Sequence, residues 1–107
     1  MAKQLTFSYN GKDYTLEYTR ASVRQMEADG FIAEDIERKP MTVLPALFRG
    51  AFIAHHRFEK PKVIDEIYGQ MANKAELIER LAEMYNEPIS SLLDEPTEGN
   101  VEWSQNW

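Results

Sequence analysis

Near the N-terminus, residues 4–18 read QLTFSYNGKDYTLEY. Apolar and polar side chains alternate on both sides of the pair Asn10-Gly11. The apolar members of this alternation are Leu5, Phe7, Tyr9, Tyr14, Leu16 and Tyr18. Asn-Gly favours a type I′ turn, because both residues accept a positive φ, so the stretch predicts a β-hairpin. A lone hairpin is only marginally stable in water, so its apolar face is expected to rest on helices.

Downstream of the hairpin, apolar residues recur at helical spacing and predict a series of helices. Their expected ranges are 20–29, 42–56, 61–71 and 74–86, followed by a short helix over 89–93 that begins after Pro88. Residues 33–37 are expected to form a short turn between the first two helices. The fold class predicted is α+β, mainly α, with the N-terminal hairpin packed on a bundle of about four helices.

Local signals set the expected helix boundaries. Thr19 and Thr42 are candidate N-caps, and Gly30 can supply the left-handed residue that ends the first helix. Asn73, followed three residues later by Glu76, predicts a variant of the capping box.

Two glycines, Gly50 and Gly69, fall inside predicted helices, where glycine costs about 1 kcal/mol relative to alanine. We interpret both as sites of close helix packing; a contact surface is the alternative.

The length of the chain and the absence of internal repeats predict one globular domain over residues 1–96 and an acidic, tryptophan-containing tail over residues 97–107. Residues 86–107 carry five acidic residues and no Lys or Arg, out of a net charge of −6 for the 107-residue chain. Val101, Trp103 and Trp107 give the tail a strand-like pattern. The tail is therefore expected to be flexible or strand-like, either pairing with the hairpin or ordering on a partner.

Composition excludes several kinds of site. The chain has no cysteine, which removes disulfides and thiolate chemistry, and its negative charge disfavours nucleic acid and anionic membranes as partners. It lacks a glycine-rich phosphate loop and an export signal at its start, so the cytoplasm is the expected compartment. No cofactor is expected.

The adjacent pair His55-His56 is a candidate for metal binding or catalysis. Adjacent residues point about 100° apart on a helix, so the two rings are not expected to share one metal ion. We interpret them as residues of a helix C-terminus, where histidine meets the negative end of the helix dipole. Neither a catalytic residue nor a metal site is predicted, and the chain is not expected to be an enzyme.

Protein binding is the function that remains, with two candidate surfaces. One is the tail, because tryptophan is costly to leave in water and is enriched in interface hot spots. Its predicted binding residues are Val101, Trp103 and Trp107. The other is a basic stretch containing Arg49, Arg57 and Lys60, which could receive an acidic partner; the alternative is that these are solvated charges at a helix end.

Several segments together resemble small proteins encoded in the tail-morphogenesis region of siphophages and prophages of Gram-positive bacteria. The segments are residues 7–20, 24–31, 39–42, 50–57 and 99–103, and the resemblance covers nearly the whole chain. It implies a tail assembly chaperone that coats the tape measure protein, keeps it soluble, and helps recruit tail tube protein. It also implies action in the host cytoplasm and absence from the mature virion. Self-association is a further expectation.

Two other classes remain as alternatives. The first is a structural part of the virion, such as a head–tail connector or a minor tail component. The second is a small hydrolase using His55 or His56, which is not favoured because no spacing of candidate residues indicates an active site.

Overall fold

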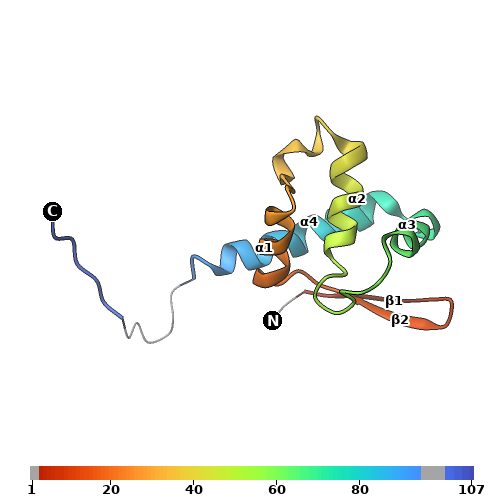
Figure 1. Ribbon diagram of the computed structural model, residues 1–107, viewed down its shortest axis with the longest axis horizontal. Coiled ribbons are helices and arrows are strands. Elements are labelled where there is room, and N and C mark those ends of the chain that lie inside the picture. The colour runs from red at the N-terminus through yellow and green to blue at the C-terminus, as the bar shows by residue number, and fades with distance from the viewer. Residues whose placement is uncertain (1–2, 95–100) are drawn as a thin grey trace.

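The computed structural model describes residues 3–94 and 101–107 and has an α+β fold that is mainly α (Figure 1). An antiparallel hairpin comes first and four α-helices follow, with a short 3-10 helix between the first two. The elements are β1 Leu5–Tyr9, β2 Lys12–Leu16, α1 Arg20–Ala28, the 3-10 helix Ala33–Ile36, α2 Pro40–Gly50, α3 Pro61–Gln70 and α4 Lys74–Ser91. The predicted fold class is therefore confirmed. The limit at residue 96 predicted for the globular domain, and the predicted start of the tail at residue 97, lie outside the described residues.

The hairpin turn forms as the Asn-Gly pair predicts. Asn10 and Gly11 have φ values of 51° and 77°, which is the left-handed region that a type I′ turn requires. The register pairs Leu5 with Leu16 and Phe7 with Tyr14, so the apolar side chains of both strands share one face. Figure 1 shows the helices lying over one side of this hairpin.

An aromatic cluster joins the hairpin to the helices. Phe7 stacks on Tyr14 at a centroid distance of 5.3 Å, and Phe52 meets Tyr14 edge-on at 5.7 Å. Phe48 of α2 in turn meets Phe52 at 5.1 Å. Tyr14, Phe48 and Phe52 are all buried, so the core lies where the hairpin face meets α2 and the segment that follows it.

Helix α1 has the boundaries that the sequence predicts. The Thr19 hydroxyl accepts a hydrogen bond from the Ser22 N–H at 3.0 Å, and the Ser22 hydroxyl accepts one from the Thr19 N–H at 2.8 Å. This reciprocal pair satisfies two backbone donors that a helix start leaves without partners. Gly30 follows the helix with φ of 95°, as expected for the residue after a helix end.

Helix α2 differs from its prediction at both ends. It begins at Pro40 and not at a cap on Thr42, because proline lacks an N–H and fits the first helical turn. It ends at Gly50, so the predicted extension to His56 is wrong. After Gly50 the chain unwinds into turns, and the Ala51 carbonyl accepts a hydrogen bond from the Glu17 N–H at 3.1 Å. Pairing with the hairpin thus replaces the last turns of the predicted helix.

Helix α4 corrects two further predictions. It runs unbroken to Ser91, so Pro88 does not begin a separate helix. Pro88 is buried together with Met84 and Tyr85, and this packing compensates for the backbone hydrogen bond that proline cannot donate. The predicted capping box is also wrong, because Asn73 has a left-handed backbone (φ 52°) and its side chain makes no cap hydrogen bond.

The two helical glycines have different surroundings. A Cβ atom on Gly50 would collide with Sδ and Cε of Met26 from α1, so glycine lets these two helices approach closely. A Cβ on Gly69 would meet nothing within 4 Å. The packing interpretation is therefore confirmed for Gly50 and wrong for Gly69.

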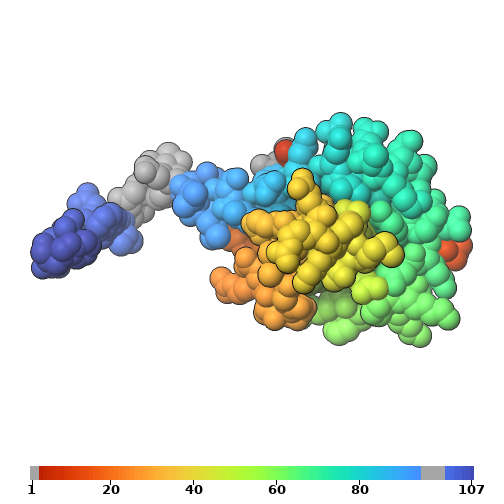
Figure 2. Space-filling view, turned by 90° about the horizontal axis from the view of Figure 1, so that it is seen from above, coloured from red at the N-terminus to blue at the C-terminus, as the bar shows by residue number. Residues whose placement is uncertain are grey.

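The described part of the tail, residues 101–107, contains neither helix nor strand. Trp103 is 85% exposed and Trp107 is 94% exposed. Figures 1 and 2 both show these residues standing clear of the helices. Of the two alternatives for the tail, pairing with the hairpin is not observed among the described residues.

Candidate protein-binding site

A pocket of about 500 Å³ opens between the end of α1, the 3-10 helix, α2 and the segment that leads into α3. We call it the α2 pocket. Its lining residues are Met26, Asp29, Gly30, Phe31, Ile32, Asp35, Lys39, Thr42, Val43, Ala46, Arg49, Gly50, Phe52, Ile53, His56, Arg57, Glu59, Pro61 and Ile64. This volume is within the range of about 300–1,000 Å³ typical of ligand pockets.

The floor of the α2 pocket is apolar and belongs to the core. Met26, Val43, Phe52 and Ile64 contribute to it and are all buried. The walls include Ile32, which is 52% exposed although it is a large apolar side chain. An apolar floor with an exposed apolar wall is suited to an aromatic or aliphatic side chain of a partner.

Charged side chains lining the α2 pocket differ in whether they already have partners. Glu59 accepts hydrogen bonds from the Tyr14 hydroxyl at 2.7 Å and from Lys12 Nζ at 3.1 Å. The hydrogen bond from Tyr14, with a second from Lys12, lowers the pKa of Glu59. Burial, helped by the hydrogen bond to Glu59, raises the pKa of Tyr14 to about 12. This carboxylate is therefore held in the structure as an anion at neutral pH.

Arg49 is also engaged. Its Nε and one terminal nitrogen donate to the two oxygens of Asp65 at 3.1 and 2.7 Å, which ties α2 to α3. The hydrogen bonds to Asp65 raise the pKa of Arg49. Lys39 and Arg57, by contrast, have no acidic side chain of the described residues within ion-pair distance. These two cations remain available to an acidic group that approaches the pocket.

The structure brings together only part of the predicted binding set. Arg49 and Arg57 both line the α2 pocket, and Lys60 follows Glu59, whose side chain accepts the Lys60 N–H at 3.2 Å. The three tail residues lie elsewhere. Sequence reasoning missed the apolar floor of the pocket, for which the helical Gly50 was the available signal.

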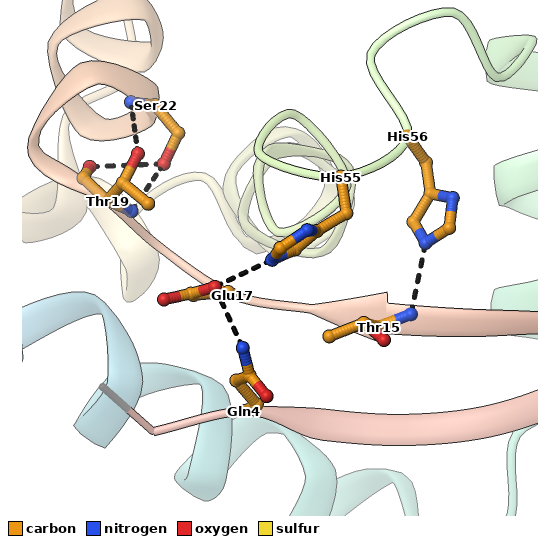
Figure 3. A network of polar contacts seen from close by, with 7 residues as sticks. All are labelled: Gln4, Thr15, Glu17, Thr19, Ser22, His55 and His56. Atoms are coloured by element: carbon orange, nitrogen blue, oxygen red, sulfur yellow. Dashed lines mark hydrogen bonds and ion pairs between the residues drawn. The ribbon is translucent and has the colours of Figure 1, made fainter. Parts of the chain in front are cut away.

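The histidines do not form the helix terminus that was predicted (Figure 3). His55 Nε2 lies 2.6 Å from Oε1 of Glu17, and His56 Nε2 accepts the Thr15 N–H at 3.0 Å. The hydrogen bond with His55, followed by that from Gln4, lowers the pKa of Glu17. Burial lowers the pKa of His56. Both rings thus fasten the segment after α2 to the hairpin, His56 to Thr15 of β2 and His55 to Glu17, the residue that follows β2.

A second group of exposed apolar side chains lies at the end of α4 and in the described part of the tail. Among the described residues, nine large apolar side chains are exposed, and six of them fall in residues 89–94 and 101–107. These six are Ile89, Leu92, Leu93, Val101, Trp103 and Trp107. We call them the C-terminal apolar surface. Such a concentration of exposed apolar groups is typical of a surface that binds another protein.

Over residues 3–94 and 101–107, no group of three or more His, Asp or Glu side chains is placed to hold a metal ion. Over the same residues, every helix is too short or too polar to cross a bilayer.

Comparison with known proteins gave one match. The profile of a family described as a domain of unknown function, DUF5055, matches residues 1–107. Neither the curated proteins nor the solved structures contain a match to the chain.

Proposed function

The chain belongs to the DUF5055 family, and we propose that it is a phage tail assembly chaperone. In this role it binds the tape measure protein, keeps it soluble, and helps recruit tail tube subunits. It acts in the host cytoplasm and leaves before the virion is complete. It binds protein and carries out no chemical step.

The observation that carries this proposal is the C-terminal apolar surface. A chaperone of this kind must offer apolar contacts to a client and still remain in solution itself. Leu92, Leu93 and the two tryptophans supply such contacts, because each is at least 64% exposed. Residues 86–107 carry five acidic residues, among them Glu102, and no Lys or Arg, and this negative charge opposes aggregation.

The resemblance to siphophage tail-region proteins supports the choice of client. The tape measure protein is the long, hydrophobic component of that system and the one that most needs a partner before assembly. Tryptophan suits this task, because one ring buries about 150–250 Å² of surface on contact.

Co-expression with the proposed client, the tape measure protein, tests the proposal. We expect the full chain to keep most of the tape measure protein in the soluble fraction. A double variant, Trp103→Ser with Trp107→Ser, should lose most of this effect. The matched control changes Ser104→Ala and Gln105→Ala, which alters the same segment and keeps both rings. Equal solubility with both variants would exclude the tail from client binding.

Mass spectrometry of purified virions separates the chaperone from the structural alternative. We expect the protein to be missing from finished particles and present in lysates of infected cells. Its recovery from virions at a fixed copy number would instead indicate a head–tail connector or a minor tail component.

A further inference from the structure

The α2 pocket and the tail have complementary chemistry. The pocket offers an apolar floor, an exposed apolar wall at Ile32, and the cations Lys39 and Arg57. The tail offers an exposed Trp103 directly preceded by Glu102, in a segment that carries no Lys or Arg. The lining also contains the carboxylates of Asp29, Asp35 and Glu59, and those of Asp35 and Glu59 are paired with Arg38 and Lys12. A ring with a neighbouring carboxylate fits the apolar floor beside the two cations that have no ion-pair partner among the described residues.

The position of the tail bears on whether it enters the α2 pocket of its own chain or that of a second copy. The tail follows α4, whose last turn is held next to the start of α1, since Arg20 donates to the Ser91 carbonyl at 2.9 Å. The α2 pocket instead begins at the other end of α1, at Met26 and Asp29. Figure 2 shows residues 101–107 clear of the body that contains the pocket. In this arrangement the tail does not occupy the pocket of its own chain.

We propose that Trp103 of one copy enters the α2 pocket of a second copy, with Glu102 facing Arg57. This contact joins two different surfaces, a tail and a pocket, so it is heterologous. It leaves the tail of the second copy free to bind a third, and such contacts produce rings or open chains. Because a single ring and one ion pair hold each contact, association is weak and depends on protein concentration and on salt.

Cysteine cross-linking tests the contact directly, because the chain has no cysteine of its own. One preparation carries Ser104→Cys, which keeps both tryptophans. The other carries Thr42→Cys, an exposed α2 residue that lines the pocket. The control replaces this second variant with Met41→Cys, which is adjacent and exposed but does not line the pocket. The two preparations carry tags of different size and are mixed under mild oxidation.

We expect a disulfide-linked heterodimer from the Ser104 and Thr42 variants, at several times the yield of the Met41 control. Equal yields would mean random collision and would overturn the proposal. A chain carrying both Ser104→Cys and Thr42→Cys shows whether the tail of the same chain occupies the pocket instead. If this chain forms only an intramolecular disulfide, the tail fills the pocket of its own chain, and the proposal is also overturned.

Charge reversal supplies a second, independent readout. Arg57→Glu in the pocket copy should reduce the heterodimer yield by about tenfold, because it places like charges against each other at the contact. Lys62→Glu makes the same change of charge at an exposed position outside the pocket lining and should leave the yield unchanged. An equal reduction by both variants would point to overall charge and contradict the contact. None of these measurements involves the tape measure protein, so their failure would leave the proposed function standing.

Discussion

The hairpin and the tail both carry aromatic residues in alternation, yet they have opposite surroundings. Tyr14 of the hairpin is buried against Phe52, whereas Trp103 and Trp107 of the tail are exposed. The difference lies in what covers each segment. His56 bonds to β2 and Ala51 bonds to Glu17, the residue after it, but the described residues provide no strand or helix against residues 101–107. Aromatic residues therefore build a core in one region and remain available to a partner in the other.

The largest expected effect comes from removing one aromatic ring from each region. Phe52→Ala should lower the free energy of unfolding by about 3–5 kcal/mol, because the ring is buried and contacts both Tyr14 and Phe48. Trp103→Ala should change it by less than about 0.5 kcal/mol, because that ring is exposed. Urea denaturation of dilute protein measures both values. A large loss for Trp103→Ala would show that the tail belongs to the core.

The two helical glycines provide an intermediate effect of opposite sign. Gly50→Ala should destabilise the protein by about 1 kcal/mol, because the new methyl group overlaps the end of the buried Met26 side chain, which must move to make room. Gly69→Ala adds a better helix former in open space and should stabilise by at most about 1 kcal/mol. Thermal unfolding followed by circular dichroism would show the two midpoints moving in opposite directions. A shift in the same direction would contradict the close approach of α1 and α2.

Replacing His56 gives the smallest of the three effects on the free energy of unfolding, and this effect depends on pH. Burial, with help from Lys12 and His55 and against Glu59, lowers the pKa of His56 below its ordinary 6.5. The unfolded chain therefore binds a proton more readily than the folded one, so stability falls as pH drops from 6.5 towards the lowered pKa. His56→Gln should cost about 1 kcal/mol at neutral pH and flatten this part of the profile.

The carboxylates of Glu17 and Glu59 provide an internal check on the dependence of stability on pH. Glu17 and Glu59 have pKa values lowered from 4.5, so their contribution is present above pH 4.5 and is lost as pH falls below it. Urea unfolding measured across the acid range should therefore show two separate losses. If His56→Gln keeps the loss that begins near pH 6.5, His56 is not its source.

Local signals were sufficient for much of the fold. Asn10-Gly11, Thr19 and Gly30 each act through their own backbone conformation or a near neighbour, and the sequence predicted all three. The end of α2 depends on bonds between Thr15 and His56, 41 positions apart, and between Glu17 and Ala51, 34 positions apart. Helical spacing alone carries no information about such pairs. The same holds for Pro88, whose place inside α4 depends on long-range burial.

The candidate site was predictable in part for the same reason. Residue type alone identified Arg49, Arg57 and the two tryptophans, because charge and aromatic content are visible in sequence. The α2 pocket was not predictable, because its floor combines Met26, Val43 and Ile64 from three different helices. Only the tertiary arrangement shows that Arg49 is paired with Asp65, whereas Arg57 has no ion-pair partner among the described residues.

Tryptophan fluorescence tests the central claim most directly, because the only two tryptophans of the chain both lie in the tail. The measurement follows the emission of dilute full-length protein as the tape measure protein is added. We predict a solvent-exposed emission at the start, then a blue shift and slower quenching as the rings become buried. If the two proteins co-migrate on a sizing column while the emission stays unchanged, the tail is not the binding surface.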